Sequence, residues 1–186
     1  MGRGRAVWLE GFSEDAKGTD QLQKQGPDHV RLLAMGLLGE AGSVLSEVKK
    51  GRREGAAYPA LRSKLLEEIG DFLWYYVRLV DVLSRGLLEE LASDEKARTH
   101  RDRTNDLEAI LGFGAAVGRL LGSIRGDGDA RAVQGALRRV WDELNTVSAV
   151  AKIPLSEAAV ANVRKRSDRW SPNPLQLPLF DEQYPK

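Results

Sequence analysis

The chain has 186 residues, of which 42% are hydrophobic and 30% are charged. This composition is typical of a globular protein with one sizeable domain or two small related halves. The formal net charge of +1 gives no electrostatic reason to expect nucleic acid or an anionic membrane as a partner. With no cysteine, disulfides and thiolate metal sites are excluded. We find no targeting segment and no apolar run near the about 18 residues of a membrane span, so we expect a cytoplasmic protein.

Two helices are predicted in the first 50 residues. The first runs from about Leu9 to Asp20. The second begins near Pro27, which suits the first turn of a helix, and runs to about Lys50. Gly51 is its expected stop, followed by a loop.

The second predicted helix carries acids on its apolar face. At about 100° per residue, Glu40, Ser43 and Glu47 share one narrow strip, and Leu37 and Val44 lie within roughly 60° of Glu40. Burying an unpaired carboxylate costs several kcal/mol, so such a group needs a cation or a hydrogen-bond donor.

A long, strongly periodic helix is predicted from about Tyr58 to Ser84. Glu68 and Asp71 lie together on the flank of its apolar stripe. Two helices that each offer carboxylates can build an oxygen-ligand site for Mg²⁺ inside a bundle. The alternative is a solvated acidic face, because Glu-x-x-Asp is common on surface helices.

These segments resemble the MazG-like, all-α nucleoside triphosphate pyrophosphohydrolase superfamily. Its hallmark is an ExxE helix followed, after a variable gap, by an ExxD helix. The resemblance covers Gly36–Gly42, Lys49–Lys50 and Glu67–Asp71. One position departs from the pattern, because Ser43 stands where the family has its second glutamate. We take Glu47, one helical turn further on, as the substitute.

Two other phosphate-cleaving classes are disfavoured. A shorter helix is predicted from about Leu87 to His100, after Gly86. His29 and His100 are the only histidines, and neither is followed by aspartate, which argues against an HD-type phosphohydrolase. A P-loop NTPase is excluded because the sequence has no Gly-x-x-x-x-Gly-Lys-Ser/Thr segment.

From Leu107 the sequence can be aligned with the first half as a repeat. Leu66–Leu73 can be laid on Leu137–Leu144, and Gly39–Ala41 then falls near Gly114–Ala116. In this alignment Glu40 becomes Ala115, Glu68 becomes Arg139, and only Asp142 is retained as an acid. The alternative is coincidence between two helical hairpins.

The repeat predicts two related halves that form a pseudo-dimer. Simple members of the family pair two subunits, and the resemblance implies that here the neighbour is fused into the chain. We therefore expect residues 1–103 to carry the acidic site and residues 104–170 to form a degenerate half packed on it. A homodimer of these tandem chains is a further option.

The last predicted helix, about Leu155 to Arg169, resembles the family's Asn-x-x-Lys-x-x-x-Arg segment. In the family those side chains can contact phosphates and base, which here would be Asn162, Lys165 and Arg169. The alternative is a basic helix end that complements the helix dipole. Residues 171–186 are proline-rich and are expected to form an extended arm.

We expect an all-α bundle of about six to seven helices. The resemblance implies Mg²⁺-dependent hydrolysis of a nucleoside triphosphate to the monophosphate and pyrophosphate, in nucleotide-pool house-cleaning, with Mn²⁺ as an alternative ion. The candidate residues fall into three groups: metal ligands Glu40, Glu47, Glu68 and Asp71; catalytic residues Glu40, Glu67 and Glu68; and substrate-binding residues Lys49, Trp74, Tyr75, Asn162, Lys165 and Arg169.

Two other functions stay open from the sequence. The serine at position 43 and the degenerate half are compatible with a nucleotide-binding regulatory protein of little or no turnover. A helical interaction protein with simply solvated acids is the third reading.

Overall fold

The fold is all-α, as the sequence predicts. The computed structural model describes residues 6–22, 28–84, 86–94, 106–125 and 129–169, and within these ranges it contains seven α-helices and no strand. The helices are α1 (Ala6–Thr19), α2 (His29–Glu54), α3 (Leu61–Leu83), α4 (Leu87–Asp94), α5 (Asp106–Arg125), α6 (Ala130–Ala151) and α7 (Leu155–Arg169). Pro27, His100 and the proline-rich segment 171–186 lie outside the described residues.

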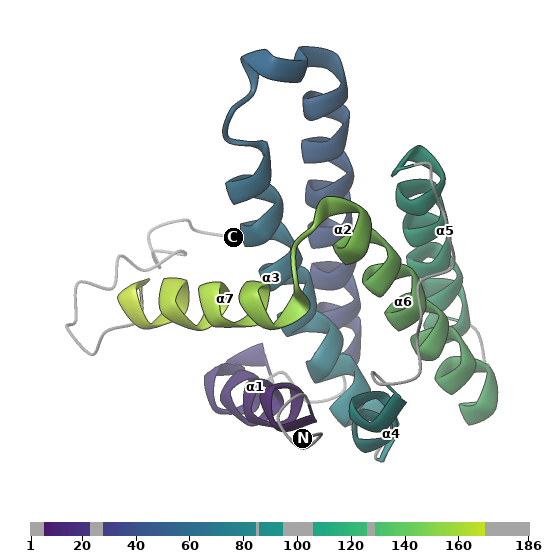
Figure 1. Ribbon diagram of the computed structural model, residues 1–186. Helices are drawn as coiled ribbons and strands as arrows, with labels where there is room; N and C mark the ends of the chain where they lie inside the picture. Colours follow the sequence, from purple (N-terminus) through teal and green to yellow (C-terminus); the bar gives the residue numbers. More distant parts are fainter. Residues whose placement is uncertain (1–5, 23–27, 85, 95–105, 126–128, 170–186) are drawn as a thin grey trace, which may run out of the picture.

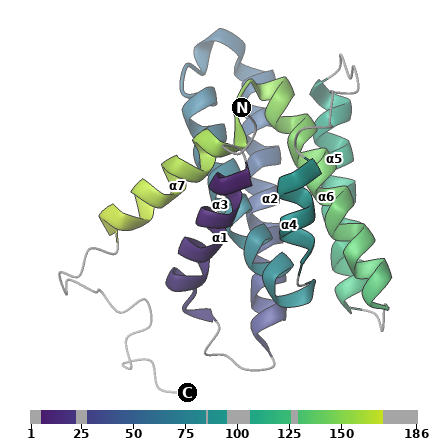
Figure 2. The same ribbon diagram turned by 60° about the horizontal axis from the view of Figure 1, so that its bottom comes forward.

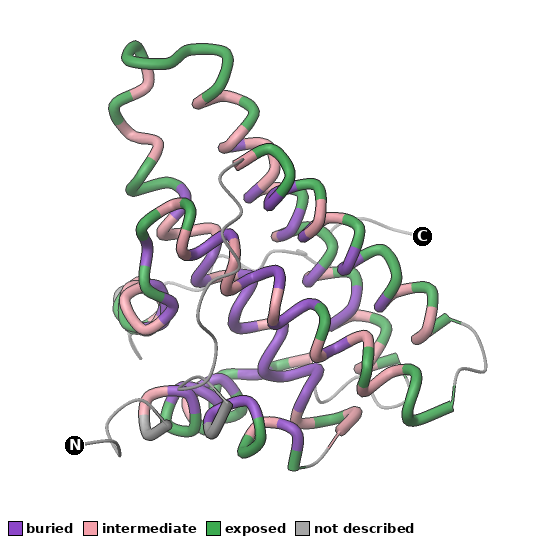
Figure 3. The backbone as a smooth tube through the Cα atoms, turned by 45° about the vertical axis from the view of Figure 1, so that its right-hand side comes forward, coloured by how far each residue is buried: buried purple, intermediate pink, exposed green. Residues whose placement is uncertain are grey.

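Two antiparallel hairpins, α2–α3 and α5–α6, form the body of the molecule. The α2–α3 hairpin lies in the middle, with α5–α6 on one side and α1 and α7 on the other (Figures 1 and 2). Helix α7 crosses α3, which brings the end of the described chain back to the first hairpin. The turn that closes α2–α3 extends into solvent (Figure 3).

Aromatic side chains join the two hairpins into one core. The ring of Phe72 on α3 meets that of Phe113 on α5 edge to face, with centroids 4.8 Å apart. Tyr76 stacks on Trp141 of α6 at 5.7 Å, and its hydroxyl donates to the carbonyl oxygen of Leu137 at 2.9 Å. The apolar stripes of the two hairpins are therefore buried against each other.

A buried ion pair fixes the end of α1 on α3. Asp20 is almost fully buried, and its carboxylate accepts from Arg78 Nε at 2.9 Å and lies 2.8 Å from His29 Nε2. Burial alone would raise the pKa of Asp20, but the hydrogen bonds from His29 and Arg78 outweigh it and lower that pKa. This pair positions Thr19 beside the site described below.

Gly51 does not end α2, contrary to the sequence-based expectation. The helix continues to Glu54, and Gly55, with φ of 54°, forms its C-cap. A Cβ atom on Gly51 would lie 2.5 Å from Leu61 Cδ2, so Gly51 serves close packing of α2 on α3. The connection therefore comes later in the chain than expected, at residues 55–60, and α3 begins at Leu61 instead of at about Tyr58.

Helix α5 is more apolar than one buried face requires. The sequence analysis found no apolar run of membrane-spanning length, but α5 is the one helix among the described residues that is long and apolar enough to cross a membrane. The mean hydropathy of that stretch is 1.5, and 33% of it is buried. It packs on α2 and α6, so one face belongs to the core and an apolar face remains outside.

The shared core gives a stability prediction. Trp141 is fully buried between the hairpins, so Trp141→Ala should lower the free energy of unfolding by about 3–5 kcal/mol in urea titrations. Val160→Ala, at an exposed position on α7, should change it by less than about 0.5 kcal/mol. A loss below about 1 kcal/mol for Trp141→Ala would show that the hairpins do not depend on this contact.

Candidate metal centre

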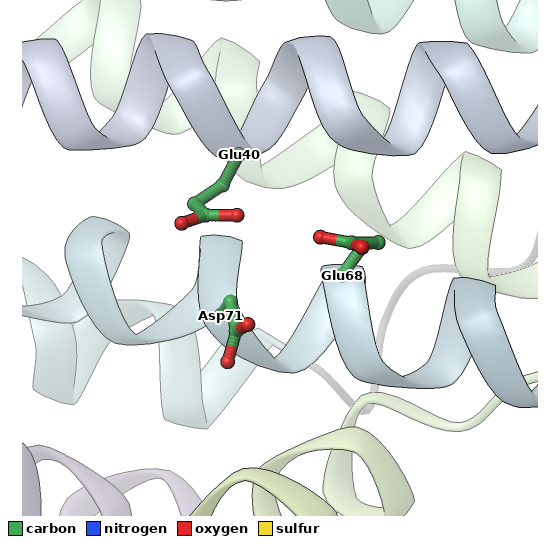
Figure 4. A group of neighbouring side chains, drawn as sticks. All are labelled: Glu40, Glu68 and Asp71. Carbon is green, nitrogen blue, oxygen red and sulfur yellow. The ribbon is translucent and has the colours of Figure 1, made fainter.

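Three carboxylates meet between α2 and α3. Glu40 projects from α2, and Glu68 and Asp71 project from α3 one turn apart (Figure 4). One oxygen atom from each of the three lies within 4.8 Å of the others. The antiparallel packing of α2 on α3 creates this cluster, because each acid lies at the edge of its own helix's apolar stripe.

The cluster holds more negative charge than its surroundings readily accept. Burial, followed by repulsion from Asp71 and Glu68, raises the pKa of Glu40 from 4.5 to about 7. Burial and the same kind of repulsion, first from Asp71 and then from Glu67, also raise the pKa of Glu68. A cation placed among the three oxygens would relieve this repulsion.

Helix α7 supplies polar partners to the same cluster. Lys165 Nζ donates to Asp71 and lies 2.9 Å from Glu67 Oε1. Asn162 Nδ2 donates to Asp71 Oδ1 at 2.7 Å. Burial would lower the pKa of Lys165, but the bonds to Asp71 and Glu67 reverse that effect and raise it. The second half of the chain thus contributes directly to the acidic site.

Arg166 ties this arrangement to α1, and the sequence analysis missed it. Its Nε donates to Asn162 Oδ1 at 2.8 Å, and its terminal nitrogens donate to Thr19 and Asp15. Because Arg166 occupies the amide oxygen of Asn162, the amide nitrogen is directed at Asp71. Its position four residues after Asn162, hence on the same helix face, was the available sequence signal.

Gly70 permits the close crossing of α3 and α7. A Cβ atom at this position would lie 2.6 Å from the carbonyl oxygen of Ala158 and 3.0 Å from Asn162 Cβ. Any side chain would push α7 outward and carry Asn162 and Lys165 away from Asp71. The glycine next to Asp71 therefore has a packing role.

Glu47 and Lys49 lie apart from the three carboxylates. Glu47 is buried, and it accepts hydrogen bonds from Lys50 and from the hydroxyl of Tyr58. These bonds, first that from Lys50, lower the pKa of Glu47, and its negative charge still contributes to the raised pKa of Glu68. Lys49 is exposed, and nine residues after Glu40 it lies about 180° around α2 from that side chain.

The two candidate aromatic residues differ in their access to the site. Trp74 is buried, and its Nε1 donates to Thr19 Oγ1 at 3.2 Å, so little of the indole is free to meet a base. Tyr75 is half-buried, and a Cβ on Gly36 would lie 2.1 Å from its ring, so its ring lies directly on α2 one turn before Glu40. The side chain of Arg169 lies outside the described part of the structure.

A pocket of about 590 Å³ lies elsewhere, between the closed end of the α2–α3 hairpin and the adjoining ends of α5 and α6. Its lining is mainly apolar and includes Val48, Leu65, Ile110 and Val147. None of the predicted site residues lines it.

The three carboxylates fit a hard divalent cation. Mg²⁺ takes oxygen ligands and usually retains several waters, so a set of three acids leaves positions for water and phosphate. The half-buried position and the raised pKa of Glu40 distinguish this group from ordinary solvated acids.

Comparison with protein-family models, with curated proteins and with solved structures gives no match.

The crowding of the acids predicts how stability varies with pH. The pKa of Glu40 is raised in the folded state. The contribution of its protonation to folding stability is therefore fully present below pH 4.5 and is lost as pH rises through about 7. In EDTA, Glu40→Gln should therefore be more stable than the wild type at pH 8, by about 1 kcal/mol in urea titrations. The matched control Glu14→Gln, at an exposed position on α1, should leave the profile unchanged. A destabilised Glu40→Gln protein would contradict the repulsion argument.

The crossing at Gly70 gives a second prediction. Gly70→Ala should cost about 1–3 kcal/mol, because the new methyl group meets backbone on α7. Gly11→Ala, in an exposed stretch of α1 with open space around it, should instead stabilise by about 0.5–1 kcal/mol. Equal effects of the two substitutions in thermal melts would mean that α7 does not press on α3 at this point.

Proposed function

We propose that the protein is a Mg²⁺-dependent nucleoside triphosphate pyrophosphohydrolase that releases the nucleoside monophosphate and pyrophosphate. The observation that carries the proposal is the cluster of Glu40, Glu68 and Asp71 oxygens within 4.8 Å. The class of reaction comes from the resemblance to MazG-like proteins, whose acidic helices correspond to these segments.

In this proposal, the three carboxylates hold the ion. When bound, Mg²⁺ supplies charge neutralisation for the triphosphate and lowers the pKa of a coordinated water. Glu40, whose pKa is raised to about 7, would have to be deprotonated to serve as a charged ligand. Glu47 remains with Lys50 and Tyr58 and supports the hairpin from outside this set.

Lys165 changes partners in the proposed cycle. It pairs with Asp71 and Glu67 when no cation is bound, and a cation at Asp71 would weaken that pairing by repulsion. The Lys165 ammonium group would then be available to the phosphates of the substrate, while Asn162 keeps its hydrogen bond to Asp71. Glu67, partly exposed and freed of Lys165, is the candidate to orient the attacking water.

Tyr75 is the better of the two aromatic candidates for contact with the base. It lies next to Glu40, whose charge contributes after burial to the raised pKa of its hydroxyl. Trp74 has a positioning role in this proposal. Its indole nitrogen donates to Thr19, and Thr19 accepts a hydrogen bond from Arg166.

A ligand substitution with product analysis tests the proposal. The protein is incubated with Mg²⁺ and each of the eight canonical ribo- and deoxyribonucleoside triphosphates, and products are separated by ion exchange. We expect monophosphate and pyrophosphate from at least one of them. Glu68→Gln, which keeps the shape of the ligand but removes its charge, should lower that rate about 100-fold or more while the helical circular-dichroism signal is retained.

Glu10→Gln, an exposed acid on α1, serves as the matched control and should keep full activity. Unchanged turnover in Glu68→Gln, or a diphosphate with inorganic phosphate as products, contradicts the assignment. Tight Mg²⁺-dependent nucleotide binding without turnover supports a regulatory protein instead.

A further inference from the structure

The outer side of α2 and α5 forms one apolar face. These helices pack antiparallel, since Leu45 faces Gly114 and Arg52 pairs with Asp106. Large apolar side chains lie exposed on them, among them Met35 (68%), Leu38 (52%) and Leu111 (60%). The helical repeat places all three on the side that faces away from α3 and α6.

Each helix of this face carries a stretch of uncharged outward positions. On α2 its outward positions between Arg31 and Lys49 are Met35, Leu38, Gly39, Gly42 and Ser46. On α5 the corresponding positions are Leu111, Ala115, Gly118 and Gly122, all exposed. Large apolar residues beside glycines allow close approach of another helix pair, and a contiguous apolar patch of this kind marks an interaction site.

The charges at the edge of the face show which partner fits. Glu108 and Arg119 are both exposed and lie 11 residues apart, which is three helical turns and an angular offset of about 20°. They therefore flank the same edge of the α5 face, about 16 Å apart along the helix. If a second copy of α5 packs antiparallel on this face, the acid of each copy therefore lies opposite the base of the other.

We propose that this face joins two copies of the chain in a symmetric dimer, with the two α5 helices antiparallel across the two-fold axis. With the axis midway along the Glu108–Arg119 interval, each Glu108 lies opposite the partner's Arg119, because same-edge positions meet in antiparallel helix pairs. Leu111, which lies close to that axis on α5, is buried by the same contact. This inference is independent of the proposed activity, since the carboxylate cluster lies on the opposite, α3-facing side of α2.

Light scattering after size exclusion tests the assembly over a concentration series. We expect twice the monomer mass for the wild type, and the monomer mass for Leu111→Glu. Val160→Glu, a matched change at an exposed apolar position on α7, should remain dimeric. A monomeric wild type at all concentrations overturns the proposal, and so does a Leu111→Glu protein that still dimerises.

A charge exchange tests the orientation. Glu108→Arg and Arg119→Glu should each raise the dimer dissociation constant at least about tenfold, because symmetry places like charges opposite each other twice. The double variant should return to within about threefold of the wild type, because the pairs are restored in reverse. Failure of the double variant to recover overturns the antiparallel arrangement.

The absence of cysteine allows a position-specific check. Ala115→Cys lies near the proposed axis and should be joined to its mate by a short bismaleimide, whereas Val160→Cys should not. Because α5 is also apolar enough for a lipid surface, flotation with neutral phosphatidylcholine vesicles is included. Flotation of the wild type, lost in Leu111→Glu, would assign the face to a bilayer and overturn the dimer.

Discussion

Repulsion among three carboxylates between α2 and α3 is the constraint around which the rest of the structure is arranged. Glu40, Glu68 and Asp71 lie close enough to share one ion, and their common environment raises the pKa of Glu40 to about 7. A fold selected only for stability would separate or neutralise such groups. Their retention at a packed helix pair is therefore the main physical argument for a binding site.

The other elements hold this costly arrangement in place. Helix α7 crosses α3 at Gly70 and brings Lys165 and Asn162 to Asp71. Arg166 connects Asn162 to α1, and α1 is in turn anchored on α3 through Asp20 and Arg78. The second hairpin supplies Trp141 and Phe113 to the core beneath the site. Helix α7 thus contacts Asp71 directly, and α1 supports that contact through Arg166.

The organisation of the chain as two related halves remains a prediction. The order and packing of the helices are compatible with it. Each hairpin is followed by a shorter helix, α4 or α7, and the two hairpins bury their apolar stripes on each other. One detail of the sequence alignment needs adjustment. Ala115, aligned with Glu40, is exposed on the outer side of α5, whereas the neighbouring Ala116 is buried and faces inward.

Helical periodicity accounts for what the sequence could predict. It gave the all-α class, the position of Glu40 on the apolar face of its helix, and the position of Glu68 and Asp71 on the flank of theirs, because these follow from about 100° per residue. The same rule places Lys49 on the side of α2 opposite Glu40. The sequence alone therefore argues against the substrate-binding role expected for Lys49.

Other features depend on tertiary contacts that local patterns do not contain. Gly51 serves close packing where a helix stop was expected. Glu47 accepts a hydrogen bond from Tyr58 because the turn after α2 brings the Tyr58 side chain back to that helix. Arg166 reaches Asp15, 151 residues earlier in the chain.

The most direct test of the proposed metal site is a crystal structure of the protein soaked in Mn²⁺, with anomalous scattering measured at the manganese edge. The account predicts an anomalous peak between Glu40, Glu68 and Asp71, with Lys165 withdrawn from Asp71. Crystals with no peak among these three side chains, and with Lys165 still bonded to Asp71, would contradict it.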